Sequence, residues 1–238
     1  MKEIASRSLQ QAKQMTKILP ANDRAAQNQA VNLLKNGDVV VFPTDTIYGI
    51  GASITQESGV QKIYEVKSRS PDKPLIIFIA SLEQLPQITT NVPESVITSL
   101  GKLWPGGLSA IFPKNDFIPS FVTSGQDNVG VRIPNHPLCW QLVRQVGTPL
   151  AVTSANISGI DTPPTAPEIS AQLGNRVPLV LDGGRNPQPQ PSSIVDFTSS
   201  PPQLLREGVW SFSQLCQIIP DLQPISSIVL HANSKSGN

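Results

Sequence analysis

The sequence contains few of the residues that most metal sites and catalytic triads use. Its 238 residues include two cysteines, Cys139 and Cys216, and two histidines, His136 and His231. The cysteines lie far apart in apolar helical patterns, and no Cys/His spacing matches a zinc site. We therefore expect two core thiols in a reducing compartment, two surface histidines, and no metal bound by protein side chains.

Charge is also scarce. Eighteen Lys and Arg against 17 Asp and Glu give a net charge of +1, and only 15% of the residues are charged. Such a balance gives no overall attraction to nucleic acid, so any basic site must be local. No apolar run is long enough to span a bilayer, and the N-terminus lacks the apolar region of a signal peptide. These absences predict a cytoplasmic protein without membrane contact.

Proline, by contrast, is abundant. The chain has 23 prolines, roughly twice the average usage. Most of them fall between periodic segments, where a fixed backbone angle stiffens loops. Rigid loops suit a preformed binding site.

Hydrophobic periodicity predicts alternating helices and strands. Asn22 is expected to cap the first helix. Helical patterns cover residues 22–37, 57–69, 93–107, 136–147, 166–174 and 211–222. Apolar runs predict buried strands at residues 38–43, 75–80, 109–114, 128–134, 178–184 and 192–197, and a strand followed by a turn at 149–159.

Short connections predict two antiparallel pairs, 109–114 with 128–134 and 178–184 with 192–197. The predicted fold class is therefore α+β (mixed α/β), an open, twisted mixed sheet with helices packed on it. We expect an N-terminal extension over residues 1–21 and one domain over residues 22–210. Residues 211–238 would form a C-terminal helix and a disordered tail.

A short cationic loop follows the second predicted helix. Lys67, Arg69 and Lys73 fall within seven residues, and Pro71 interrupts them. A loop fixed between a helix and a buried strand can hold a phosphate. Cations at a helix C-terminus are, however, more often solvated residues that meet the helix dipole, and the loop alone favours that interpretation.

Polar residues end several of the apolar segments. Residues 43–51, PTDTIYGIG, contain hydroxyls on both sides of Asp45 and two glycines, and residues 152–159 read VTSANISG. Each segment alone predicts a turn in which side chains cap their own backbone. Together with the cationic loop and Arg132, they follow the pattern of ligand groups at the rim of an open sheet. The combination predicts one crevice.

This polar set contains no evident general base, and the sequence has no phosphate-binding GxxxxGK[ST] loop. Lys, Arg, Ser, Thr and Asn instead favour catalysis by charge neutralisation and positioning, as in reactions at phosphorus.

The segments PTDTIYGIG, KSRSPDKPL, LWPGGLSAIF, VGVRIP, SANISG and LLREG, in this order, resemble the YrdC-like threonylcarbamoyl-AMP synthase family over about residues 22–210. The resemblance implies a YrdC-like fold with a basic central cavity. It also implies synthesis of threonylcarbamoyl-adenylate and pyrophosphate from L-threonine, bicarbonate or carbon dioxide, and ATP as a substrate carrying Mg²⁺ on its phosphates. The product would pass to a TsaD-type tRNA transferase complex that modifies the adenosine next to the anticodon, and tRNA itself is a further candidate contact.

The resemblance also implies roles for individual residues. The catalytic cations would be Lys67 and Arg69. Threonine would be bound by Thr46, Arg132, Ser154 and Ser192. ATP would be bound by Lys67, Arg69, Lys73, Asn128, Asn156 and Arg206. The chemistry of these side chains is consistent with the implied roles. A carboxylate pairs well with arginine, and a triphosphate of about four negative charges needs clustered cations.

Four positions depart from the family pattern. Phe78 replaces a frequent histidine, Asn128 a frequent threonine, and Pro164 a frequent threonine or serine, while Ser192 and Ser193 stand for a Ser-Thr pair. These changes bear on amino-acid specificity more than on nucleotide binding. Longer family members carry an additional C-terminal domain, and the chain is expected to be the short form.

Two alternatives remain open on the sequence. The first is an RNA- or ribosome-binding relative without synthase activity, although few aromatic residues are interleaved with the basic ones. The second is carbamoyl-adenylate chemistry like that of hydrogenase maturation factors. That chemistry requires a neighbouring domain that processes carbamoyl phosphate, which we do not find in the sequence.

Overall fold

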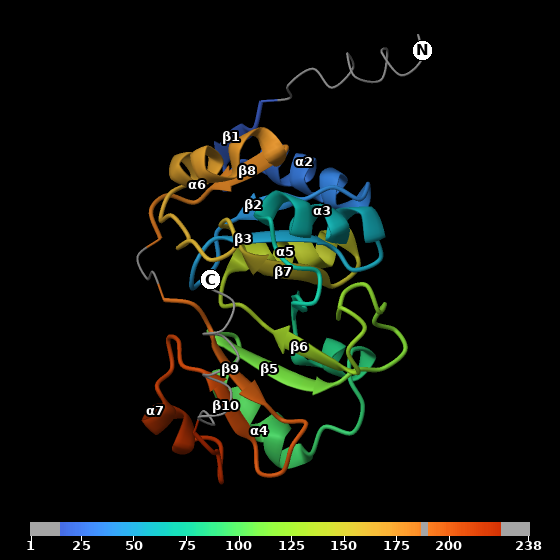
Figure 1. Ribbon diagram of the computed structural model, residues 1–238, viewed down its shortest axis with the longest axis vertical. Coiled ribbons are helices and arrows are strands. Elements are labelled where there is room, and N and C mark those ends of the chain that lie inside the picture. Colours follow the sequence, from blue (N-terminus) through green and yellow to red (C-terminus); the bar gives the residue numbers. More distant parts are fainter. Residues whose placement is uncertain (1–14, 187–189, 225–238) are drawn as a thin grey trace, which may run out of the picture.

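The apolar runs of the sequence form the middle of a mixed β-sheet. The computed structural model describes residues 15–186 and 190–224. Within them, ten strands pair in the order β1-β8-β2-β3-β7-β4-β6-β5-β9-β10. β1 and β10 lie toward opposite ends of the long axis of the molecule (Figure 1). The predicted fold class is confirmed.

The strands are short, and the helices between them span two or three turns. The strands are β1 (Lys17–Pro20), β2 (Val40–Phe42), β3 (Gly49–Ser53), β4 (Ile76–Phe78), β5 (Leu108–Pro113), β6 (Asn128–Arg132), β7 (Leu150–Ser154), β8 (Leu179–Asp182), β9 (Ser193–Asp196) and β10 (Gln203–Arg206). The helices are α2 (Arg24–Lys35), α3 (Glu57–Lys67), α4 (Glu94–Leu103), α5 (Pro137–Val146), α6 (Ala166–Leu173) and the short α7 (Phe212–Cys216), with 3₁₀ turns η1 (Leu82–Gln87) and η2 (Gly174–Arg176).

Helices cover both faces of the sheet. The apolar sides of α2 and α5 pack on one face, against alternate residues of β2, β7 and β8. The apolar sides of α3, α4 and α6 pack in a second cluster with the intervening strand residues. Because successive strand side chains point to opposite faces, the near-continuous apolar strands are explained by burial from both sides.

The predicted helices are confirmed with shorter bounds, and two details differ. Asp23 rather than Asn22 caps α2, since its carboxylate accepts a hydrogen bond from the backbone N–H of Ala25 at 2.9 Å. The last helix ends at Cys216, which is exposed and therefore not a core thiol. Cys139 is buried as expected, and burial raises the pKa of its thiol.

Three strands were not predicted: β1, β3 and β10, of which β10 pairs antiparallel with β9. β1 lies within the segment expected to be an extension, and it pairs in parallel with β8. β3 lies within the segment expected to be a turn, where Gly49 and Gly51 suggested unusual backbone angles. Neither glycine has a positive φ. A Cβ on Gly51 would instead lie 3.0 Å from the Phe42 ring, so glycine serves close packing between β2 and β3.

The prediction of strand neighbours is half right. β5 and β6 are antiparallel as expected, with Ala110 opposite Val131. β8 and β9 are not neighbours, so that prediction is wrong. β8 lies between β1 and β2, whereas β9 pairs in parallel with β5. The connection between β8 and β9 therefore links two distant parts of the sheet rather than forming a hairpin.

Among the helices that the structure describes, we find none that is both long enough and apolar enough to cross a bilayer.

Two glycine-to-alanine substitutions should have opposite effects on stability. In Gly51→Ala the new methyl group would meet the buried side chains of Phe42 and Val152, at 3.0 and 3.2 Å, which should lower the free energy of unfolding by about 1–3 kcal/mol. Gly101 lies in α4 with no atom within 4 Å of a Cβ, so Gly101→Ala should raise it by about 0.5–1 kcal/mol. Urea unfolding measures both, and a loss of similar size in the two variants would contradict the packing role of Gly51.

Candidate active site

A pocket lies on the sheet face that also carries α2 and α5. Phe78, Arg132 and Ile194 come from β4, β6 and β9 and point to this face, because their immediate neighbours in each strand belong to the opposite cluster. The pocket encloses about 220 Å³. Its position is set by the strand order, which brings β4, β6, β7 and β9 close together.

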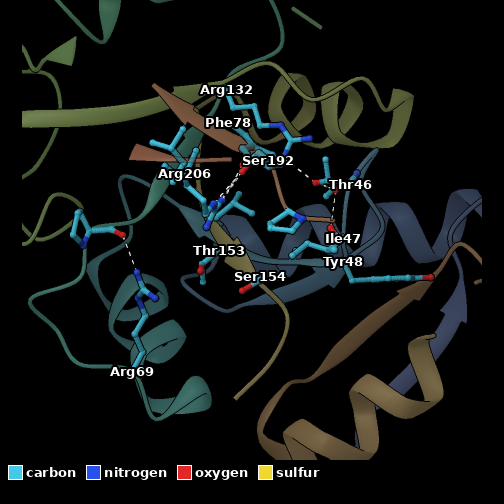
Figure 2. Close-up of a pocket in the computed structure, with 17 residues that line it drawn as sticks. Thr46, Ile47, Tyr48, Arg69, Phe78, Arg132, Thr153, Ser154, Ser192 and Arg206 are labelled. Atoms are coloured by element: carbon cyan, nitrogen blue, oxygen red, sulfur yellow. Dashed lines mark hydrogen bonds between the residues drawn. The ribbon is translucent and has the colours of Figure 1, made fainter. Parts of the chain in front are cut away.

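The lining combines three arginines, several hydroxyls and an apolar floor. The polar lining residues are Thr44, Thr46, Tyr48, Arg69, Arg132, Thr153, Ser154, Ser192 and Arg206. The other lining residues are Ile47, Gly49, Pro74, Ile76, Phe78, Val152, Pro191 and Ile194. Figure 2 shows the three arginines around the cavity, with Thr46 beside Arg132 and Ser192 beside Arg206. Within the described chain, no carboxylate side chain lines it.

Arg132 is the most constrained of the three arginines, with 4% of its surface exposed. Its Nε donates to the carbonyl of Gly106 at 2.9 Å, its Nη1 to Thr46 Oγ1 at 3.0 Å, and its Nη2 to Asp45 Oδ1 at 2.7 Å. The guanidinium carbon lies 5.5 Å from the centre of the Phe78 ring. A guanidinium has five N–H donors, so one donor on each terminal nitrogen remains for a ligand.

The hydroxyls of Thr44 and Thr46 form an ordered chain. Thr44 Oγ1 donates its only proton to the carbonyl of Ile47 at 2.7 Å. In the 3.2 Å contact between the two hydroxyls, Thr46 must therefore be the donor. Since Thr46 Oγ1 also accepts from Arg132, one of its lone pairs is left to accept a hydrogen bond from a ligand.

Arg206 is fixed against the start of β9. Its Nε and Nη2 donate to the carbonyl of Ser192 at 3.0 and 2.8 Å, and Nη2 also lies 3.2 Å from Ser192 Oγ. Ser109 Oγ contacts the same hydroxyl at 3.0 Å. Burial lowers the pKa of Arg206, and the nearby charge of Arg132 adds to that effect. Two cations that repel each other across a pocket favour an anionic ligand between them.

Arg69 follows α3 and reaches the opposite side of the pocket. Its Nε and Nη2 donate to the carbonyls of Lys73 and Pro74, at 3.3 and 3.1 Å. Tyr64 Oη donates to the same Lys73 carbonyl at 3.1 Å. Burial lowers the pKa of Arg69. The loop expected to hold phosphate therefore bends around this guanidinium.

Lys67 does not line the pocket and is 1% exposed. Its ammonium group donates to the carbonyl of Ser154, the carbonyl of Asn156 at 2.7 Å and Asn156 Oδ1 at 3.1 Å. Its own carbonyl accepts from the Ser158 N–H at 2.8 Å. Burial, followed by the charge of Arg69, lowers the pKa of Lys67 to about 7. Lys67, to which the resemblance assigned ATP binding and catalysis, is thus a buried link between α3 and the loop after β7.

The pocket brings together six of the ten residues that the sequence assigned to ligands: Thr46, Arg69, Arg132, Ser154, Ser192 and Arg206. The other four lie outside its lining. Asn156 is occupied by its own loop, where its Nδ2 donates to Ile157 and Ile160 carbonyls. Lys73 is exposed and Asn128 begins β6, while Lys67 is buried as described.

His136 was expected at the surface, and this prediction is wrong. It occupies the N-cap position of α5, is half-buried, and its buried Nδ1 has no partner among the described residues. Burial lowers the pKa of this imidazole. His231 lies outside the described residues.

Thr44, Tyr48 and Thr153 also line the pocket and were not assigned roles from the sequence. Thr44 and Thr153 adjoin assigned residues within the same polar segments, which was a usable signal. Tyr48 had none, because its hydroxyl is held by distant residues: it donates to Gly184 O at 2.7 Å and accepts from Gly183 N at 2.9 Å.

The chain is similar to proteins of a known family. The family model for Sua5, YciO and YrdC proteins, described as "Telomere recombination", matches residues 32–208. A threonylcarbamoyl-AMP synthase of Pyrococcus abyssi is 36% identical over 194 residues, which cover 82% of this chain and 57% of that protein. The synthase of Bacillus subtilis is 39% identical over 192 residues, covering 80% and 56%. The chain thus spans about half the length of these curated relatives.

Among solved structures, P. abyssi Sua5 complexed with L-threonine superposes with a TM-score of 0.83 at 34% identity. The match covers 88% of this chain and 62% of that one.

Replacing Lys67 should weaken the fold. In Lys67→Met the carbonyls of Ser154 and Asn156 lose a buried donor, so the free energy of unfolding should fall by about 1–3 kcal/mol. Lys73→Met removes an exposed lysine of the same loop and should change stability by less than about 0.5 kcal/mol. Chemical denaturation of both variants measures the difference. Equal stabilities would show that the ammonium does not anchor the loop.

Proposed function

Because the chain belongs to the Sua5, YciO and YrdC family, we propose that it makes threonylcarbamoyl-adenylate and pyrophosphate from L-threonine, bicarbonate and ATP. One observation carries the proposal: three guanidinium groups and no carboxylate side chain of the described residues line a single pocket. Such a lining fits ligands that bring several negative charges to one place.

We place threonine between Arg132 and the hydroxyls around it. The two remaining donors of Arg132 suit a carboxylate, and the free lone pair of Thr46 suits the ammonium group. Ser154 and Ser192 supply further hydroxyls from the same lining. The apolar floor, which includes Phe78 and Ile76, suits the methyl group of the substrate side chain.

ATP would place its phosphates toward Arg69 and Arg206. Lys67 and Asn156 would act mainly by fixing the loop after β7, and Lys73 and Asn128 would contact the nucleotide from outside the pocket lining. Within the described chain, no group of three or more His, Cys, Asp or Glu side chains could hold a metal ion. We therefore propose that Mg²⁺ enters on the phosphate oxygens, where it would neutralise part of their charge.

The reaction needs two bond-forming steps. The ammonium of threonine and bicarbonate give a carbamate, water and a proton. A carbamate oxygen then attacks the α-phosphorus of ATP, and pyrophosphate leaves with the electron pair of the broken P–O bond. Both reactants of the second step are anionic. Arg69 as a catalytic residue, assisted by Arg206 and the charge of Lys67, would offset their repulsion in the transition state.

The product is a mixed anhydride that reacts with nucleophiles, so it needs a prompt acceptor. We propose transfer by a TsaD-type enzyme to tRNA in the cytoplasm. Direct tRNA contact by this chain belongs to the alternative of an RNA-binding relative, and a net charge of +1 gives that alternative no overall electrostatic support.

Pyrophosphate release should require threonine, bicarbonate and ATP together. Arg132→Lys keeps a positive charge but loses the planar fork, so the KM for threonine should rise by at least about tenfold. Arg144→Lys, on the exposed side of α5 and outside this pocket, is the matched control and should leave kinetics unchanged. Release without threonine would contradict the proposal. Absence of turnover with tight, salt-sensitive tRNA binding would favour the RNA-binding alternative.

ATP binding should take up a proton through Lys67. The free protein holds this lysine with a pKa of about 7 because it is buried, and a nearby polyanion raises a lysine pKa. At pH 8, Lys67 would change from mostly neutral to charged on binding. Calorimetric titration of ATP in buffers of different ionisation enthalpy measures the uptake, and Lys67→Met should abolish it. Identical uptake in both proteins would exclude Lys67 as its source.

A further inference from the structure

Asp45 makes a buried ion pair behind the pocket. Its Oδ1 lies 2.7 Å from Nη2 of Arg132, and the two side chains are 14% and 4% exposed. Asp45 itself does not line the pocket. In the part of the chain that the structure describes, the other ion pair joins Lys62 and Asp38, whose side chains are about a third exposed. The pair of Asp45 and Arg132 is thus the buried one.

Fold stability alone does not explain this carboxylate. A buried ion pair is weak evidence for stability, since apolar residues of similar volume often serve as well. A negative charge beside Arg132 should also weaken the binding of an anionic ligand. A neutral acceptor, such as the Gly106 carbonyl or the Thr46 hydroxyl, would hold Arg132 without reducing its attraction for an anionic ligand.

The geometry suggests what the carboxylate contributes. Arg132 is held at three nitrogens by acceptors from two separate loops, residues 45–46 and Gly106. The Phe78 ring limits its movement from the side. All three bonds have a charged donor, but only the one with Asp45 also has an ionised acceptor and is shorter than 2.9 Å. Without it, Nη2 would lose its protein acceptor and the plane of the guanidinium could turn.

We propose that Asp45 is a positioning residue that orients the Arg132 guanidinium so that its remaining donors meet the carboxylate of the amino-acid substrate. The inference rests on the proposed function and adds a residue to its threonine site. Asp45 touches no substrate atom and acts through Arg132.

The other groups that face Asp45 do not compete with Arg132 for it. Burial lowers the pKa of His136, which leaves this imidazole neutral near pH 7. Burial raises the pKa of Cys139, which keeps this thiol protonated. Within the described residues, Arg132 is therefore the one charged partner of Asp45.

Binding of two ligands tests the proposal. L-Threonine and L-threoninamide share the ammonium and the hydroxyl, and only threonine has a carboxylate. By calorimetric titration, Asp45→Ala should weaken threonine binding about 10- to 100-fold and threoninamide binding by less than about threefold. A general distortion of the pocket would weaken both ligands equally, which would overturn the proposal.

Two further variants separate positioning from charge. Asp45→Asn keeps a neutral acceptor in the same place and should recover part, but not all, of the threonine affinity that Asp45→Ala loses. If Asp45 only neutralised Arg132, Asp45→Ala and Asp45→Asn would both bind threonine as tightly as the parent protein or more tightly, and the proposal would be wrong.

The double variant tests whether Asp45 acts through Arg132. In an Arg132→Met background, Asp45→Ala should cause no further loss of threonine affinity. Additive losses in the double variant would also overturn it.

Circular dichroism of each unliganded variant checks folding, and Asp45→Ser replaces Asp45→Ala if the latter does not fold. A parent protein that binds no threonine would overturn the proposed function and this inference with it. A parent protein that binds threonine, with Asp45→Ala binding it equally well, would overturn the inference alone.

Discussion

The architecture of the pocket depends on one buried guanidinium. Arg132 ends a strand in which it follows the buried residues Val129, Gly130 and Val131, and a charge in that position must be compensated by close partners. It takes them from residues 45–46, from Gly106 and from the Phe78 ring. Those three segments are far apart in the sequence. A single side chain thereby fixes the relative positions of the loop after β2, the turn after α4 and the strand β4, which form one side of the site.

A second buried cation, Lys67, also joins chain segments beside the pocket. Lys67 joins the end of α3 to the end of β7 and the loop after it through three acceptors, and Ser154, the last residue of β7, lines the pocket. The two cations differ in how they can respond to pH. Arginine stays charged under all ordinary conditions, whereas burial lowers the pKa of Lys67 to about 7, so its charge can change near neutral pH.

Much of this molecule could be predicted from its sequence, because long apolar patterns dictate burial directly. The helices of 57–69 and 136–147 and the antiparallel pair of β5 and β6 are examples. The failures have a common cause. Gly49 and Gly51 indicate a turn by composition, but Gly49 makes room for Val152 and Gly51 for Phe42, contacts that no local pattern reveals. β1 has only four residues and is mostly exposed, and only pairing with β8 defines it. Six of the ten residues to which the resemblance assigned roles line one pocket, and several of them are polar groups at strand ends, which are visible locally. Whether a lysine such as Lys67 faces solvent or a buried loop depends on tertiary neighbours instead.

The parallel pairing of β5 with β9 also has a kinetic consequence. Leu108 and Ser193 are register partners although most of the second half of the chain separates them, and such non-local pairs form slowly because loop closure must precede them. Arg206 reaches the pocket only through β9 and β10, which extend the sheet beyond β5. The pocket therefore has all three arginines only when β9 and β10 have joined the sheet.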